Sequence, residues 1–250
     1  MALFISLVSL MLIVASVWLG QVLRRRLPDH HLAGDSKEVI RLATALIGTM
    51  AAVVLALLFS STRSSYEITN HNVARLTAGI MELDTLLEEY GGTDSAALRR
   101  VLRADIERTV AAIWRDDAPI TPQLVQPAAP RDTVLYRLRQ LVPADPLQVS
   151  LQARALAVST DLDQTRLTLF AQPPDSLAKP FILVLVLWLC FIFATFSMSS
   201  SANPTLVVVL LACAFAASTA IYLILELGQP FDGLLQIPSD ALRTALKPVS

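Results

Sequence analysis

The three histidines are the first place to look for metal chemistry. His30 and His31 stand side by side in LPDHHLAGDS, with Asp29 before them and Asp35 after them, whereas His71 lies far along the chain. Adjacent histidines on a loop seldom bind the same ion, so we favour a solvated loop over a metal site. We therefore predict that the chain holds no metal and needs no cofactor.

Motifs for covalent catalysis or phosphate binding are missing. The sequence contains no recognisable Ser-His-Asp or Cys-His arrangement, no Walker loop and no GxGxxG stretch. Its two cysteines, Cys190 and Cys213, both lie in apolar segments, where a small buried side chain is the usual interpretation. The sequence therefore predicts a protein that is not an enzyme.

Charged residues beside apolar segments are more informative, because charge is expensive in a bilayer. Glu226 ends an apolar run in LILELGQPFDGLL, where a carboxylate would face the negative end of a helix. Such a group needs a partner, and Arg243 is a candidate across the turn at Pro230. We expect Glu226, Gln229, Asp232 and Arg243 to make gating or interfacial contacts. Interfacial acids in water, or a structural ion pair, are the alternative.

Four uncharged stretches are long enough to cross a bilayer, which takes about 20 apolar residues as helix. We expect spans at about 3–23, 42–61, 180–198 and 204–226, with Asn203 as an N-cap and Pro204 as the first helical residue. Only 16% of the residues are charged and 54% are hydrophobic, whereas a soluble domain has about 25% charged residues. A net charge of −1 gives no field for nucleic acid.

The second span carries small and hydroxyl-bearing residues. Thr44, Gly48 and Thr49 are its few polar or very small positions, and Ala45, Gly48 and Ala52 recur three or four apart. Such a stripe allows close helix packing in lipid, or it can face an aqueous path. Because no ring of basic residues lies within a span, any anion selectivity would come from helix ends.

Basic residues set the expected orientation. Arg24, Arg25, Arg26, Lys37 and Arg41 follow the first span, whereas the loop between the last two spans has no charge. The positive-inside rule places the loop from Arg24 to Arg41 in the cytoplasm. The long segment between spans two and three, and both termini, would then lie outside the cytoplasm.

Residues 63–179 form a helical soluble domain by their hydrophobic period, and no strand pattern occurs there. Two seams step by three and four: Val73, Leu76, Ile80, Leu83, Leu87 and Tyr90, then Leu98, Leu102, Ile106, Val110 and Ile113. Gly91 and Gly92 would end the first helix, and Asp94 or Ser95 would open the second. The second span and the first seam are close enough to form one long helix, which would couple the two parts mechanically.

Two further helices complete the expected bundle. A seam follows the start signal of Asp145 and Pro146, with apolar positions at Leu147, Leu151, Ala155, Val158, Leu162, Thr165 and Leu169. A shorter helix spans residues 133–142, and the proline-rich stretch 118–130 is a linker or an extended excursion. The predicted architecture is all-α: a transmembrane hairpin (1–62), a bundle of three or four helices (63–179), a second hairpin (180–227) and a tail (228–250).

Three blocks resemble the bestrophin-like domain family of bacterial membrane proteins: RRRLPDHHL after the first span, LVLWLCFIFATFSMSSSANPT across the second hairpin, and LILELGQPFDGLL with SDALR near the end. The likeness covers almost the whole chain. Two departures are Gly228, where the family leads us to expect Asp, and the serine-rich SMSSSANPT. A role that rests on that Asp is therefore not carried over to this chain.

The resemblance implies a homo-oligomer in the bacterial inner membrane, pentameric as bestrophins are, that conducts small anions. Bestrophins line their pore with the second span, which here selects Ala45, Gly48 and Ala52. Bestrophins keep the helical domain in the cytoplasm, in conflict with the charge argument, which we retain. The alternative is a non-conducting membrane protein whose helical domain senses or recruits a partner.

Overall fold

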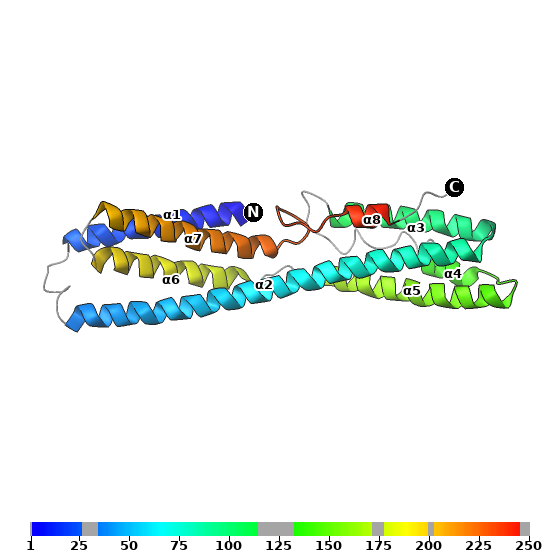
Figure 1. Ribbon diagram of the computed structural model, residues 1–250, viewed down its shortest axis with the longest axis horizontal. Helices are drawn as coiled ribbons and strands as arrows, with labels where there is room; N and C mark the ends of the chain where they lie inside the picture. The colour runs from blue at the N-terminus through cyan, green and yellow to red at the C-terminus, as the bar shows by residue number, and fades with distance from the viewer. Residues whose placement is uncertain (1, 27–34, 115–132, 172–177, 200–202, 246–250) are drawn as a thin grey trace. The chain divides into compact units, whose positions relative to one another are not determined.

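The computed structural model describes residues 2–26, 35–114, 133–171, 178–199 and 203–245 (Figure 1). The regular elements in these ranges are all helices: α1 (Ala2–Arg26), α2 (Asp35–Tyr90), α3 (Gly92–Ile113), α4 (Val134–Gln140), α5 (Pro146–Ala171), α6 (Ala178–Ser199), α7 (Pro204–Leu227) and α8 (Asp240–Thr244). The all-α prediction is confirmed over this part of the chain. The proline-rich stretch 118–130 lies outside the described residues.

The chain divides into two compact units. The membrane unit comprises residues 1–66 and 174–228, and the second unit comprises residues 67–173 and 229–250. Helix α2 contributes to both, and it is helical from Phe59 to Val73 without a break. The prediction of one long helix is therefore confirmed, while mechanical coupling through it stays a prediction.

Four of the described helices, α1, α2, α6 and α7, contain stretches long and apolar enough to cross a bilayer. The mean hydropathy of these stretches lies between 2.4 and 2.6. Pro204 is the first residue of α7 and Asn203 takes the N-cap position, although its side chain makes no cap hydrogen bond. Together these helices mark the chain as a membrane protein.

Helix α1 packs along both α6 and α7 in the membrane unit (Figure 1). At Gly20 the backbone of α1 comes so close to α6 that an added Cβ atom would stand 2.3 Å from the Ala194 carbonyl oxygen. Only glycine permits that approach. Buried apolar side chains from all three helices fill the adjoining space: Ile13, Val17, Phe193, Leu210 and Ala214.

The face of α1 that is buried in the membrane unit is rich in serine. Its buried residues include Ser6, Ser9 and Ser16, whose hydroxyls donate to carbonyl oxygens one turn earlier in α1. Two more serines connect the helices. Ser197 of α6 donates to the Val17 carbonyl at 2.7 Å, and Ser218 of α7 donates to the Ser6 carbonyl at 2.8 Å. Small hydroxyl-bearing residues thus fit close helix packing in lipid.

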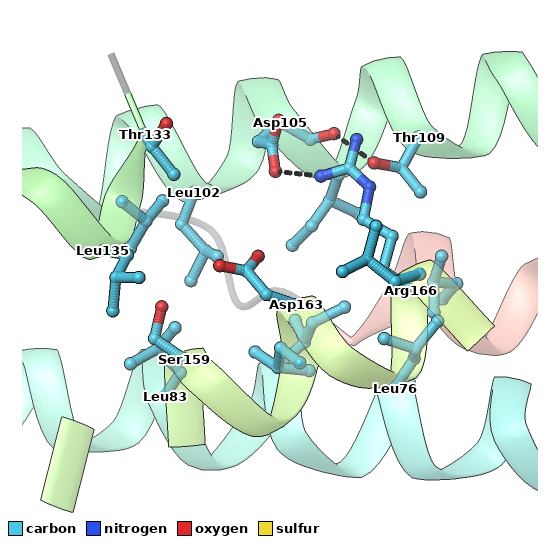
Figure 2. Close-up of a pocket in the computed structure, with 16 residues that line it drawn as sticks. Leu76, Leu83, Leu102, Asp105, Thr109, Thr133, Leu135, Ser159, Asp163 and Arg166 are labelled. Carbon is cyan, nitrogen blue, oxygen red and sulfur yellow. Dashed lines mark hydrogen bonds and ion pairs between the residues drawn. The ribbon is translucent and has the colours of Figure 1, made fainter. Parts of the chain in front are cut away.

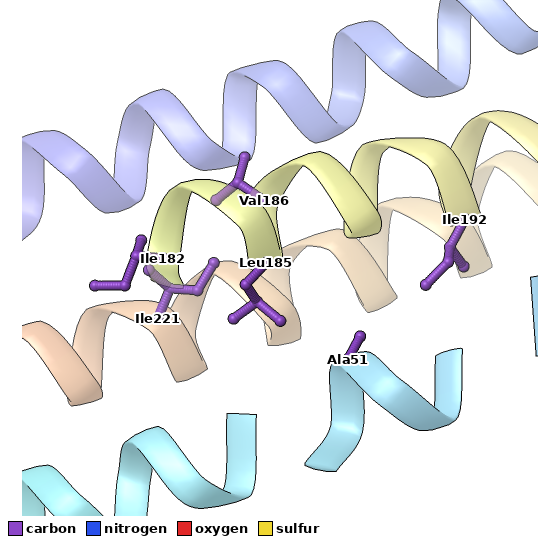
Figure 3. Packing of buried hydrophobic residues seen from close by; sticks show 6 residues of the cluster. All are labelled: Ala51, Ile182, Leu185, Val186, Ile192 and Ile221. Atoms are coloured by element: carbon purple, nitrogen blue, oxygen red, sulfur yellow. The ribbon is translucent and has the colours of Figure 1, made fainter. Parts of the chain in front are cut away.

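Helix α2 joins the membrane unit through one of its faces. Figure 3 shows Ala51 of α2 directed toward Leu185 and Ile192 of α6, with Ile221 of α7 nearby. Ile47, Leu55 and Leu58 of α2 pack against the same cluster. These positions recur at three and four residues, as expected for a helix that uses a single stripe for contact.

The second unit has the apolar core that its periodicity predicts. Both first seams are buried: Val73, Leu76, Ile80, Leu83, Leu87 and Tyr90 in α2, and Leu98, Leu102, Ile106 and Val110 in α3. Helix α5 buries Leu151, Ala155 and Val158. Leu147 does not follow the prediction, because it lies in the first turn of α5 with 58% of its surface exposed.

The junction between α2 and α3 differs from the prediction in one respect. Gly91 and Gly92 end α2 with φ angles of 71° and 84°, as predicted. Helix α3 nevertheless begins at Gly92, before Asp94 and Ser95. The buried Ser95 hydroxyl donates to the Leu87 carbonyl at 2.7 Å, so this side chain satisfies the end of α2 instead of opening α3.

Helix α5 begins as predicted. The Gln148 amide donates to a carboxylate oxygen of Asp145 at 2.7 Å, and the Gln148 side chain accepts from the Ala144 amide at 2.8 Å. This reciprocal arrangement resembles a capping box and satisfies amides at the start of the helix.

Candidate functional site

Thr44, one of the candidate pore residues, faces the inside of the membrane unit. It is 5% exposed, and its hydroxyl lies 2.7 Å from the Ile40 carbonyl oxygen and 3.2 Å from the Thr195 hydroxyl. Thr195 belongs to α6 and is itself buried. In the single chain, therefore, Thr44 holds α2 against α6.

The other candidates lie on a different side of α2. Ala45, Thr49 and Ala52 are exposed, and the Thr49 hydroxyl donates back to the Leu46 carbonyl at 2.7 Å. Gly48 is half-buried, yet an added Cβ atom there would meet no heavy atom within 4 Å. Successive helical residues turn by about 100°, which places Ala45, Thr49 and Ala52 on one side. The described residues leave this small-residue face open.

Large apolar residues form a second exposed stripe on α2 in the membrane unit. Leu42, Leu46, Val53 and Leu57 are each between 58% and 64% exposed. At about 100° per residue, this large stripe adjoins the small-residue face at Thr49, and Ala51 lies on a third side, which contacts α6. Within this span α2 consequently has three sides: one packed, one large and apolar, and one small.

Glu226 is deeply buried, at 4% exposure, in the last turn of α7. The Tyr222 hydroxyl, one turn earlier, lies within hydrogen-bonding reach of its carboxylate. Just beyond, a Cβ atom added at Gly228 would stand 3.7 Å from the Thr62 methyl group of α2. The end of α7 thus lies against α2, and Glu226 is held inside the membrane unit.

Gln229, Asp232 and Arg243 belong to the second unit. The Gln229 carbonyl accepts from the Asp232 amide at 3.2 Å, and the Asp232 carboxylate accepts from the Gly233 amide at 2.9 Å in an exposed turn. Arg243 lies on α8, and its side chain is outside the described residues. The predicted contact between Glu226 and Arg243 therefore stays a prediction.

The histidines singled out in the sequence cannot be assigned to a metal site. Asp29, His30 and His31 lie outside the described residues, and His71 is exposed on α2. Over the described ranges, no three histidine, cysteine, aspartate or glutamate side chains gather as metal ligands.

An unpredicted buried ion pair joins α2 to α3. Arg99 donates to both oxygens of Asp84, at 2.7 and 2.9 Å, and the two side chains are only 11% and 6% exposed. The hydrogen bond to Asp84 holds the pKa of the Arg99 guanidinium above its ordinary value. A sequence signal existed, because Asp84 follows Ile80 by one helical turn and Arg99 follows Leu98, which places opposite charges beside two predicted seams.

Comparison with known proteins identifies one family. A family model described as the Bestrophin-like domain matches residues 11–242, which includes nearly all of both units. No curated protein matches the chain, and no solved structure does.

Proposed function

The chain belongs to the bestrophin-like family, and from this premise we propose that it assembles with copies of itself into a membrane channel for small anions. The proposal assigns no catalytic reaction to the chain. It takes a pentamer as the assembly, by likeness to bestrophins. It also places the helical domain between spans two and three outside the cytoplasm of a bacterial inner membrane, because the basic loop follows the first span.

The three-sided character of α2 is the observation that carries this proposal. A helix side exposed to lipid gains from large apolar residues, as at Leu42, Leu46 and Val53. Ala45, Thr49 and Ala52 are exposed in the single chain, yet offer lipid little apolar surface. Lining a water-filled path between copies gives these small residues a role.

In this arrangement the five predicted lining residues divide into two roles. Ala45, Gly48, Thr49 and Ala52 face the path, while Thr44 anchors α2 through Thr195. Anion preference would come from backbone amides at helix ends, since this part of the span has no basic residue. Glu226, buried at the end of α7, would act through the packing of α7 on α2.

Chloride efflux from liposomes tests the proposal. Single cysteines at Thr49, Ala52 and Val53 would be introduced into a Cys190→Ala/Cys213→Ala background, because Cys213 is exposed. A water-soluble thiosulfonate reagent should inhibit Thr49→Cys and Ala52→Cys. Val53→Cys is the matched control on the large stripe and should keep its flux. Efflux no faster than from empty liposomes would refute a channel, whereas inhibition of Val53→Cys alone would refute the small-residue face as its lining.

Gly48→Leu provides an independent arm. No atom within 4 Å opposes a Cβ at Gly48, so a leucine should fit within the chain while narrowing a central path. We expect reduced flux with unchanged oligomer mass in detergent. A monomer or dimer without flux would instead favour the non-conducting, partner-recruiting protein.

The orientation needs its own experiment. Reporter fusions at Gly92 and at the C-terminus should both be active outside the cytoplasm. Cytoplasmic activity at Gly92 would reverse the orientation and agree with the arrangement of bestrophins.

A further inference from the structure

The second unit contains an apolar cavity of about 270 Å³ between α2, α3, α4 and α5. Its walls are mainly apolar side chains, among them Leu76, Leu83, Leu102 and Leu135 (Figure 2). A cavity of about 150 Å³ lined by apolar side chains is already able to hold benzene. The space in this unit therefore accommodates one ring or a short alkyl chain with a substituent.

Three charged side chains meet in one part of this cavity. Arg166 donates to the Asp105 carboxylate at 2.9 Å, and these side chains are 18% and 28% exposed. Arg108 stands 3.8 Å from the other Asp105 oxygen, but it is 51% exposed and does not line the cavity. Asp105 is thus neutralised within its own surroundings.

Asp163 is the charged residue of the cavity that takes part in neither of these ion pairs. Figure 2 shows its carboxylate pointing into the cavity between Leu102 and Ser159. Across the described residues it accepts no hydrogen bond, and Arg166, whose charge acts on it, donates to Asp105 instead. Burial raises the pKa of the Asp163 carboxyl, although Arg166 acts in the opposite direction. A half-buried carboxylate that accepts no hydrogen bond from the described residues favours a cation beside it.

We propose that this cavity binds a small amphipathic cation, whose apolar body lies among the leucines and whose ammonium group binds the Asp163 carboxylate. This combination matches both the shape and the charge of the site, because an apolar wall with few polar groups is typical of small-molecule sites. An anion would be repelled by the Asp163 carboxylate, and a neutral molecule would offer that carboxylate at most a neutral hydrogen bond. The inference goes beyond channel activity and does not depend on it.

Binding of fluorinated probes to the full-length chain in detergent tests this proposal. The probes are 4-fluorobenzylamine, 4-fluorobenzyl alcohol and 4-fluorobenzoate, which share a ring and differ in charge. Fluorine NMR line widths would be titrated with protein at constant detergent concentration. We expect saturable binding, with the amine roughly tenfold tighter than the alcohol because its hydrogen bond is charge-assisted, and with the benzoate weakest.

Variants assign the binding to the cavity. Asp163→Asn should remove the preference for the amine over the alcohol. Asp161→Asn is the matched control, because it removes a carboxylate two residues earlier on α5 that pairs with Arg75 at the surface. Leu135→Trp, which fills the cavity from α4, should abolish binding of all three probes. The line broadening that remains in this variant measures partition of the probes into detergent and serves as the background.

Several outcomes would overturn the proposal. One is the absence of saturable binding above that of Leu135→Trp, which would leave the three charges a purely structural cluster. Another is a preference for the benzoate. A third is an amine preference that persists in Asp163→Asn, or that disappears equally in Asp161→Asn. Should Asp163→Asn fail to fold, the order of the three probes on the natural chain still decides.

Discussion

The two units hold their helices together by different polar chemistry. In the membrane unit, hydroxyls make contacts between helices, as when Ser197 donates to Val17 and Ser218 donates to Ser6, and Arg24 adds one hydrogen bond to the Met198 carbonyl at 3.2 Å. In the second unit, guanidinium and carboxylate groups connect helices, as Arg99 and Asp84 do.

The difference follows from the solvent on the outside of each unit. A hydroxyl can donate a hydrogen bond to a carbonyl of its own helix. Placing it in lipid therefore costs little free energy even before another helix packs against it. An ion pair requires two charged groups to lose solvent, and this desolvation costs less free energy beside water than in lipid. The same contrast makes small side chains central to one unit and long ones central to the other.

The largest expected effect is on the buried pair of the second unit. Asp84→Ala leaves the Arg99 guanidinium buried without its main partner, and we expect a loss of about 3–5 kcal/mol of unfolding free energy. Urea unfolding monitored by Trp114 fluorescence, with Trp18 and Trp188 replaced by Phe, measures it.

The exposed pair of Arg75 and Asp161 is the control, and Asp161→Ala should cost about 0–1 kcal/mol. Equal losses for the two pairs would remove the distinction between buried and exposed charges. The double replacement Asp84→Leu/Arg99→Met should recover most of the stability, because it removes both charges.

The second largest effect concerns close packing in the membrane unit. Gly20→Ala places a methyl group 2.3 Å from the Ala194 carbonyl oxygen, so α1 and α6 must move apart. We expect a loss of about 1–3 kcal/mol, typical of overpacking. Gly48→Ala meets no atom within 4 Å and should leave stability unchanged. Circular dichroism during titration with a denaturing detergent compares them, and an equal loss in both would disprove the role of close approach.

A smaller effect is expected at the hydroxyl contacts. Ser197→Ala removes the hydrogen bond to Val17 and should cost about 0.6–1.7 kcal/mol, the range found between membrane helices. Thr219→Ala is the matched control, since its exposed hydroxyl bonds only within α7. The same detergent titration applies, and an unaltered Ser197→Ala variant would show that van der Waals packing alone suffices.

The smallest effect has a size that depends on pH. The pKa of Asp163 is raised in the folded chain, so its charged form is less stable there than in the unfolded chain. Asp163→Asn should therefore stabilise the second unit at neutral pH. The advantage should shrink as the pH falls through the raised pKa and vanish below the unfolded value. Urea midpoints of both chains between pH 3 and 8 test this, and a difference that grows in acid would contradict it.

Hydrophobic periodicity predicted the second unit well, because water on one side forces apolar residues to the other. The seams from Val73 to Tyr90 and from Leu98 to Val110 are buried as predicted. Hydrophobic periodicity could not predict which charged side chains of these helices would meet. Asp105, Asp163 and Arg166 come from two helices far apart in sequence, and only the fold brings them to one cavity.

Periodicity says less about the membrane unit, because all sides of a span are apolar. The span positions could be predicted, but not which face of α1 would be inside. The buried face of α1 carries serines at spacings of three and seven residues. This spacing is visible in the sequence, but a hydropathy scale counts serine as unfavourable inside a membrane and so does not point to this face. Among the candidate pore residues, Thr44 and Ala45 are adjacent in sequence, yet only the packing of α6 separates a buried anchor from an exposed position.

The serine face of α1 also bears on how the chain is made. Ser197 follows Val17 by 180 residues, so at about 5–20 residues per second α1 waits roughly 9–36 s for that contact. During this interval Ser6, Ser9 and Ser16 need no other helix, because their hydroxyls already bond to carbonyls within α1. Helix α1 can therefore move from the translocon into the bilayer as a single helix and meet α6 and α7 later by lateral diffusion.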